Sequence, residues 1–262
     1  MATTTFRQND SYAIENFIPE DVLTIDFEAL KSELEFQPMV TKHGSLVPRL
    51  VAIQGTVNSD GSAPLYRHPI SKQPDLISWT PTVKLIRDYV AGATGDDVNH
   101  SIIQYYRDGN DHIGEHSDKT LDILKNSCIY NFSVGATRKL KLRAKFKKEG
   151  HDIFMKHNSL FCLGWETNRT HTHRIDPDKR PADQKSDDEN AFNGERISFT
   201  FRQIATFTNA AGEIIGQGSG PGTADDMGQA FYQENVHENF SWDEYYGKGF
   251  NARALEITLQ PQ

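Results

Sequence analysis

The stretch DHIGEHSDKT, residues 111–120, decides the fold expected for this chain. It places His116 and Asp118 two residues apart, shortly after a glycine. Because side chains at positions i and i+2 of a strand point to the same face, the pair would present an imidazole and a carboxylate side by side. Such a pair supplies two ligands of the two-histidine, one-carboxylate set that leaves coordination positions open on Fe(II). The same spacing also occurs in ordinary polar loops, so both interpretations stay open until a third ligand is found.

A third ligand has to come from elsewhere in the chain. The segment NRTHTHRID offers His171 and His173, again two residues apart. Further along, ERISFTFRQ places Arg196 and Arg202 on one face of a predicted strand. Two buried arginines are costly unless an anion pairs with them, and a dicarboxylate meets that need through paired hydrogen bonds to guanidinium. The alternative is a surface strand whose arginines lie in solvent.

The composition is that of a folded, globular protein. The chain has 262 residues, of which 37% are hydrophobic, which is enough for a buried core. No run of about 18 apolar residues is present, so no transmembrane helix is expected. The start, MATTTFRQND, lacks the apolar segment of a secretory signal. We therefore expect a cytoplasmic or nuclear protein, with no membrane partner, in which Cys128 and Cys162 are free thiols.

The charge balance bears on nucleic-acid binding. The formal net charge is −8, whereas a protein that grips phosphates usually shows a basic face. The run RKLKLRAKFKK, residues 138–148, could still form a local basic patch. The alternation favours a solvated strand face, with Lys and Arg outside and Leu140, Leu142 and Phe146 partly inside.

Helical patterns precede strand patterns along the chain. Residues 1–20 predict an irregular arm, and residues 19–37 carry apolar side chains at helical spacing. TPTVKLIRDYVAGATG, residues 80–95, predicts a helix that Thr80 can cap. The N-terminal third is therefore expected to supply helices.

Strand patterns dominate the rest. SLVPRLVAIQG, residues 45–55, predicts an edge strand, because Pro48 cannot donate a ladder hydrogen bond. From residue 99 onward about eight short runs alternate with period two, and residues 176–194 form an acidic inserted loop. Helices followed by strands predict an α+β fold, a β-sandwich or jelly roll braced by helices.

Three motifs in this order, QYYRDGNDHIGEHSD, TNRTHTHRI and RISFTFR, resemble the AlkB family of Fe(II)- and 2-oxoglutarate-dependent dioxygenases. The resemblance covers about residues 47–207. It implies a double-stranded β-helix (jelly roll) core braced by N-terminal helices. It also implies an N-terminal arm and helix (1–40), an AlkB-like dioxygenase domain (41–208), and a C-terminal extension that packs on or covers the core (209–262).

The resemblance implies site residues one by one. The iron ligands are His116, Asp118 and His173, with His173 preferred to His171 because the His-x-Ile spacing matches the family and Asn168 stands five residues before it. The residues matching the 2-oxoglutarate site are Gln104, Tyr106, Arg196, Thr200 and Arg202. Gln104 stands where the family usually has asparagine. The implied reaction consumes 2-oxoglutarate and O2, oxidises a C–H bond, and releases succinate and CO2.

Two substrate classes are open. A small molecule, an amino acid or secondary metabolite, is favoured, and an alkylated nucleobase in DNA or RNA is the alternative. The small molecule is favoured because His43 replaces the family's aromatic wedge, Thr120 replaces its base-reading acid, and the loop 183–189 is acidic. The segment HGSLVPR and the basic run support the nucleobase. Residues expected to face the substrate are Arg49, Tyr66, Arg67 and Thr120.

The aromatic tail, Phe240, Trp242, Tyr245 and Tyr246, could either close over the pocket or pack on the core. Packing is favoured. The sequence leaves the oligomeric state open.

Overall fold

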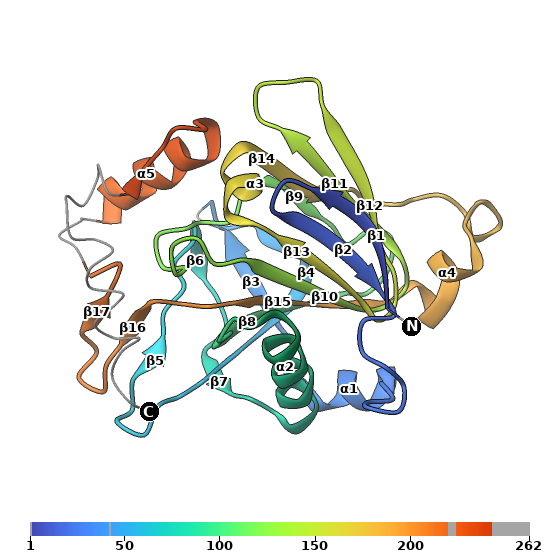
Figure 1. Ribbon diagram of the computed structural model, residues 1–262, viewed down its shortest axis with the longest axis horizontal. Helices are drawn as coiled ribbons and strands as arrows, with labels where there is room; N and C mark the ends of the chain where they lie inside the picture. The colour runs from blue at the N-terminus through green and yellow to red at the C-terminus, as the bar shows by residue number, and fades with distance from the viewer. Residues whose placement is uncertain (1, 42, 220–223, 243–262) are drawn as a thin grey trace.

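The structure, a computed structural model, describes residues 2–41, 43–219 and 224–242 (Figure 1). The helices are α1 (Phe27–Glu33), α2 (Pro81–Thr94), α3 (Trp165–Thr170), α4 (Asp187–Asn190) and α5 (Ala224–Val236), with the 3-10 turns η1 (Ala182–Gln184) and η2 (Ala191–Gly194). The strands are β1 (Thr3–Gln8), β2 (Ser11–Glu15), β3 (Gln37–Thr41), β4 (Leu46–Gly55), β5 (Ala63–Pro64), β6 (Ile70–Lys72), β7 (Leu76–Ser78), β8 (His100–Tyr106), β9 (Ile113–His116), β10 (Ile129–Gly135), β11 (Arg138–Ala144), β12 (Gly150–Met155), β13 (Ser159–Leu163), β14 (His171–Ile175), β15 (Arg196–Arg202), β16 (Thr206–Thr208) and β17 (Ile214–Gly216).

Two sheets face each other and enclose the site. The larger sheet has the order β1-β2-β13-β10-β15-β8-β4-β3-β6, with β7 added beside β4, and the smaller has the order β12-β11-β14-β9. Apart from the parallel β4–β7 pair, all pairings in these two sheets are antiparallel. Leu140 and Leu142 of the smaller sheet pack in one apolar cluster with Val51, Ile53 and Ile102 of the larger sheet. The result is an α+β fold with a sandwiched core.

Helices α1 and α2 cover the outer face of the larger sheet (Figure 1). Leu30 of α1 and Ile86 of α2 are buried in the same cluster as Phe199 and Phe201 of β15. Because a strand alternates its faces, this packing turns the even-numbered residues of β15, including Arg202, toward the space between the sheets. All seven residues of β15 are buried, so the alternative of a surface strand with solvent-exposed arginines is excluded.

The N-terminal segment differs from the predicted irregular arm. Residues 3–15 form the hairpin β1–β2, and β2 pairs with β13 so that the hairpin extends the larger sheet. Strands therefore occur before the helices as well as after them. The hairpin is short and its first strand is largely exposed, which is why the sequence shows no clear alternation there.

Strand β4 is not the edge strand that Pro48 predicted. It lies between β3 and β8 in the larger sheet. Its pairing with β8 begins only at Leu50, so the pairing with β8 needs no N–H donor from Pro48. The carbonyl of Pro48 accepts a hydrogen bond from the N–H of His112 at 3.1 Å.

The predicted helix at residues 80–95 is present as α2. Pro81 occupies its first turn, but the Thr80 side chain makes no capping bond and its hydroxyl accepts from the Gln54 amide at 3.2 Å. The helix ends at Gly95, whose φ of 81° is the left-handed conformation that glycine adopts without steric cost.

The basic run is confirmed as a strand face in β11, with two differences. Lys139 pairs with Asp152, and Lys141 pairs with Asp176. Phe146 was expected partly inside but is 61% exposed, and Arg138 was expected outside but is only 6% exposed. Cys128 and Cys162 are free thiols. In the described part of the chain, no helix is both long enough and apolar enough to cross a membrane.

Candidate active site

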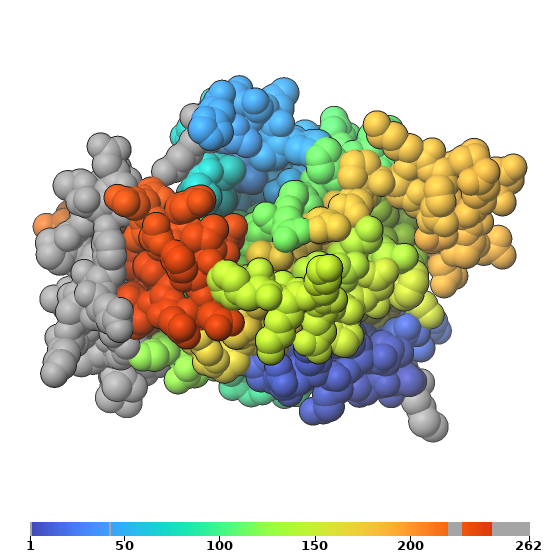
Figure 2. All heavy atoms as spheres, turned by 90° about the horizontal axis from the view of Figure 1, so that it is seen from above, coloured from blue at the N-terminus to red at the C-terminus, as the bar shows by residue number. Residues whose placement is uncertain are grey.

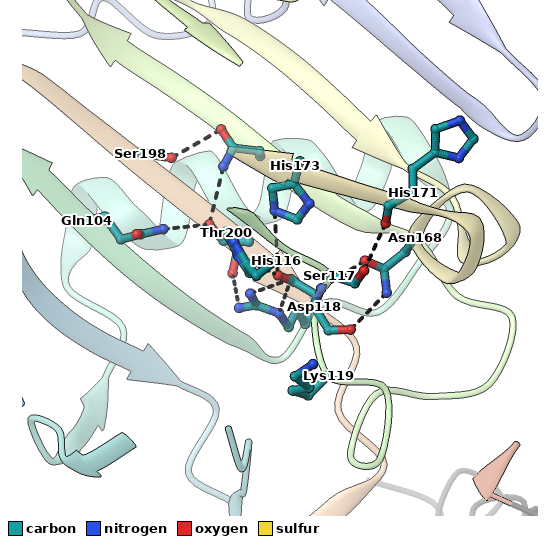
Figure 3. Close-up of polar contacts among 12 residues, drawn as sticks. Gln104, His116, Ser117, Asp118, Lys119, Asn168, His171, His173, Ser198 and Thr200 are labelled. Atoms are coloured by element: carbon teal, nitrogen blue, oxygen red, sulfur yellow. Dashed lines mark hydrogen bonds and ion pairs between the residues drawn. The ribbon is translucent and has the colours of Figure 1, made fainter. Parts of the chain in front are cut away.

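Three predicted ligands meet between the sheets. His116 ends β9 and His173 lies on β14, and the register of the smaller sheet places these two residues directly opposite each other. Their ring centroids are 4.3 Å apart. One donor atom from each of His116, Asp118 and His173 lies within 4.8 Å of the others (Figure 3). One backbone pairing thus brings together His116 and His173, which are 57 positions apart in sequence (173 − 116 = 57).

The two carboxylate oxygens of Asp118 face different residues. Oδ2 accepts a hydrogen bond from Nη2 of Arg202 at 2.6 Å, while Oδ1 lies 3.6 Å from His116 Nε2 and 3.8 Å from His173 Nε2. Burial would raise the pKa of Asp118, but the Arg202 guanidinium, His173 and His116 together outweigh it and hold the pKa well below its usual range. The group is therefore a carboxylate that presents one free oxygen to the two histidines.

Both histidines direct Nε2 toward the Asp118 carboxylate. Nδ1 of His116 lies 2.8 Å from the Gly114 carbonyl oxygen, which favours a proton on Nδ1 and leaves the Nε2 lone pair facing Asp118. Burial, with His116 as a neighbour, lowers the pKa of His173 to about 3. A neutral imidazole is the form that binds a metal.

His171 does not belong to this cluster. Its Nδ1 lies 2.9 Å from the Thr170 hydroxyl, and Figure 3 shows its ring directed away from His116 and Asp118. Only its backbone carbonyl serves the site, because it accepts the hydroxyl of Ser117 at 2.9 Å. Of the two histidines in HTH, the structure brings His173 to the other ligands.

Arg196 is a buried cation without a counterion among the described residues. Its side chain is fully buried, and its Nε donates to the Ser133 hydroxyl at 2.8 Å and its Nη2 to the Asn131 carbonyl oxygen at 3.3 Å. Nη1 has no hydrogen-bond partner in the described part of the chain. The guanidinium carbon lies 5.2 Å from the ring centroid of Tyr106. Burial lowers the pKa of Arg196 to about 10, so it is still charged at neutral pH.

The other four predicted cosubstrate residues line one cavity, whose lining does not include Arg196. The Gln104 amide nitrogen donates to the Thr200 hydroxyl at 3.4 Å, and its oxygen accepts from Nε of Arg49 at 2.5 Å. Gln104, Tyr106, Thr200 and Arg202 all line a cavity of about 390 Å³ that also contains the three ligand residues. The longer amide of Gln104 is thus held by Arg49.

The predicted substrate residues divide into two groups. Arg49 and Tyr66 line the cavity, and the Tyr66 ring lies 4.3 Å from the guanidinium carbon of Arg202. Arg67 does not line this cavity and pairs with the buried carboxylate of Asp122 at 2.6 Å. Thr120 also lies outside the cavity lining, and its N–H donates to a carboxylate from α5. These two placements do not fit direct substrate contact.

Several residues of the site were missed by the sequence reasoning. Asn131 and Ser133 of β10 accept hydrogen bonds from Arg196. The guanidinium carbon of Arg138, on β11, lies 5.7 Å from the centroid of the Tyr106 ring, and this guanidinium donates to three backbone carbonyls. The alternation of Asn131 and Ser133 with Tyr130 and Phe132 was the available signal for a polar face on β10. Arg138 had none, because the surrounding run is basic and mostly exposed.

The comparisons with known proteins now bear on this geometry. Residues 10–202 match the model of the 2OG-Fe(II) oxygenase superfamily. The chain belongs to this superfamily. It is therefore an iron- and 2-oxoglutarate-dependent oxygenase with a double-stranded β-helix fold, and Fe(II) and 2-oxoglutarate are its implied cofactors.

About half of the chain is similar to curated proteins. The chain is 31% identical over 134 residues to a Homo sapiens protein named DNA oxidative demethylase ALKBH2, covering 48% of this chain and 47% of that protein. The Mus musculus protein of the same name is 30% identical over 134 residues, covering 48% and 52%. An uncharacterised protein of Acanthamoeba polyphaga mimivirus is 26% identical over 133 residues, covering 51% and 64%. The alignments thus span about half the length of the mammalian relatives. Among solved structures, OsALKBH1 is 14% identical with a TM-score of 0.49, covering 77% of this chain and all of that one.

The residues of this oxygenase fit the two implied groups. Two imidazoles and one carboxylate form the donor set that suits Fe(II) and leaves open positions. The unpaired Nη1 of Arg196 is the orphaned buried donor that a carboxylate of 2-oxoglutarate would satisfy. When bound, the iron and its cosubstrates supply the oxidising chemistry. The chain's own side chains bind and orient, and the apolar cavity wall excludes water.

Proposed function

We propose that this oxygenase oxidises an alkyl group carried by a nucleobase, leading to its demethylation. The observation that carries the proposal is the similarity to mammalian proteins named as DNA oxidative demethylases. It reverses the order that the sequence favoured, in which a small molecule came first. The cavity supports it, because Tyr66 and His68 are stacked with ring centroids 5.3 Å apart and both line the wall. Flat aromatic walls suit a base turned out of its stack.

In this proposal the site residues have the following roles. His116, Asp118 and His173 hold Fe(II), and Arg202 keeps the carboxylate of Asp118 ionised and oriented. Arg196, supported by Tyr106, takes one carboxylate of 2-oxoglutarate. Residues Gln104, Thr200 and Arg202 line the cosubstrate side of the cavity, and Arg49 and Tyr66 line the substrate side.

A small-molecule substrate is the second candidate, and specific contacts favour it. The cations of β11 that could meet a phosphate backbone are already paired: Lys139 and Arg143 with Asp152, and Lys141 with Asp176. His43, in the wedge position, is exposed in the β3–β4 turn. Cations that are already paired attract a polyanion less than free ones do.

Succinate formation separates the two candidates. The purified chain is supplied with Fe(II), 2-oxoglutarate and either a methylated oligonucleotide, the same oligonucleotide without methyl groups, or methylated free nucleosides. We expect the methylated oligonucleotide to raise succinate release several-fold and to lose its methyl group in step with it. Equal rates with and without methyl groups, together with stimulation by a small molecule, would exclude the nucleobase in favour of the second candidate.

We also propose that the N-terminal helices brace the wall that carries the arginines. Leu30 of α1 is 1% exposed and shares its cluster with Phe199 of β15. Leu30→Ala should lower the free energy of unfolding by about 2–5 kcal/mol, measured by urea denaturation. Glu28→Ala on the exposed face of the same helix should change it by less than about 0.5 kcal/mol. Equal effects of the two variants would show that α1 does not brace the sheet.

A further inference from the structure

Residues 117–120, which follow the proposed iron ligand His116 and include the second ligand Asp118, have an unusual set of hydrogen bonds. Four consecutive backbone N–H groups, those of residues 117–120, each donate to a side chain and not to a strand partner. Ser117 N–H donates to Asn235 Oδ1 at 2.9 Å, Asp118 N–H to Asn168 Oδ1 at 2.9 Å, Lys119 N–H to the Tyr66 hydroxyl at 3.1 Å, and Thr120 N–H to Glu234 Oε1 at 2.8 Å.

These four acceptors come from three parts of the chain. Asn168 lies on α3, Tyr66 lines the substrate side of the cavity, and Asn235 and Glu234 lie on α5. Strand β9 ends at His116, so no sheet ladder fixes the backbone at Asp118. Since buried N–H groups have to be paired, the conformation of this segment depends on where those acceptors stand.

Helix α5 makes further contacts with the same segment. The buried Lys119 ammonium donates to the Phe231 carbonyl at 3.0 Å and to Asn235 Oδ1 at 3.2 Å. Leu121, which follows the segment, packs with Phe231 and Trp242 in a small apolar cluster. Lys145 of the β11–β12 turn donates to the Glu234 carbonyl at 2.8 Å, and Figure 2 shows α5, in orange-red, lying against the lime-green β11–β12 region. These contacts hold α5 against residues 117–121 and against the β11–β12 turn.

We propose that α5 positions the iron-binding loop and that Asn235 is its main positioning residue. Asn235 Oδ1 holds the N–H that stands between His116 and Asp118, so its loss would free the backbone on which both ligands depend. Helix α5 lies outside residues 10–202, which match the superfamily. This chain therefore adds a support for its metal site from its C-terminal extension. The proposal rests on the ligand set of the proposed function.

The test is direct binding of Mn²⁺, a redox-stable stand-in for Fe(II), followed by electron paramagnetic resonance. Asn235→Ala should weaken Mn²⁺ binding by about 10- to 100-fold, the range found when an outer support of a metal ligand is removed. Asn235→Asp keeps an oxygen at Oδ1 that can accept from Ser117, so it should bind Mn²⁺ nearly as the unchanged protein does. Tyr232→Ala, on the exposed face of α5, is the matched control and should have no effect.

The outcomes are separable. If the unchanged protein binds Mn²⁺ and His116→Ala does not, the ligand set stands whatever Asn235→Ala does. Unaltered binding by Asn235→Ala, or equal weakening by Asn235→Asp, would then overturn the positioning role of Asn235. Loss of folding in Asn235→Ala, seen by circular dichroism, would also overturn it, because α5 would then stabilise the domain as a whole.

Discussion

His173→Ala should weaken Mn²⁺ binding by about 100-fold or more and abolish iron-dependent succinate formation. The free energy of metal binding is shared among few ligands, so the loss of one removes several kcal/mol, and about 1.4 kcal/mol corresponds to a tenfold change in affinity. Nε2 of His173 lies 3.8 Å from Asp118 Oδ1 in the ligand cluster. Isothermal titration with Mn²⁺ and a succinate assay measure the two effects.

His171→Ala is the matched control for this prediction. It removes a histidine two residues away on the same strand, yet its ring contacts Thr170 and points away from the cluster. Because Ser117 uses only the backbone carbonyl of residue 171, this variant should keep metal binding and most of its activity. A severe effect of His171→Ala with a mild effect of His173→Ala would mean that the ligand set has been assigned to the wrong histidine.

The sequence predicted the parts of the site that depend on local alternation. Arg196 and Arg202 lie on the same face of β15, of which Arg202 lines the cavity, and His116 and Asp118 lie together because they are two residues apart. The choice of His173 over His171 came from the family resemblance and agrees with the direction of their rings. These features repeat within one strand or one turn, so the chain carries them as a pattern.

Features that depend on distant pairing were not predicted. The hydrogen bond between Ser117 and Asn235 spans 118 residues, and nothing in QENVHENF distinguishes Asn235 from any polar helix residue. The hairpin β1–β2 is stabilised by its pairing with β13. In that pairing Leu160 lies opposite Ile14, which is 146 positions earlier in the sequence (160 − 14 = 146). The tail prediction is tested only in part: Trp242 is buried beside Phe231 and contacts Phe240, whereas Tyr245 and Tyr246 lie outside the described residues.

Arg196→Met should weaken the affinity for 2-oxoglutarate by about 100-fold or more while leaving the metal site intact. A carboxylate brought into this pocket without its guanidinium would be left unpaired, which costs about 3–5 kcal/mol and corresponds to about 100-fold or more in Kd. Arg196 makes none of its hydrogen bonds to the three ligand residues, since its partners are Ser133 and Asn131. Mn²⁺ binding should therefore be unchanged. Fluorescence titration with 2-oxoglutarate in the presence of Mn²⁺ measures the first effect.

The same substitution should not destabilise the protein without its cosubstrate. A fully buried guanidinium with one donor atom unpaired and no carboxylate partner among the described residues is itself a cost to folding, and Met fills a similar volume without charge. The midpoint of thermal unfolding should therefore stay the same or rise. Arg202→Met should behave differently, because Arg202 pairs with Asp118 at 2.6 Å and its loss leaves a buried carboxylate alone. It should weaken binding of both Mn²⁺ and 2-oxoglutarate and lower the unfolding midpoint. If the two variants proved alike in metal affinity and stability, the two arginines would not have the separate roles assigned to them. Arg196 would then be a core residue and would not bind a carboxylate of 2-oxoglutarate.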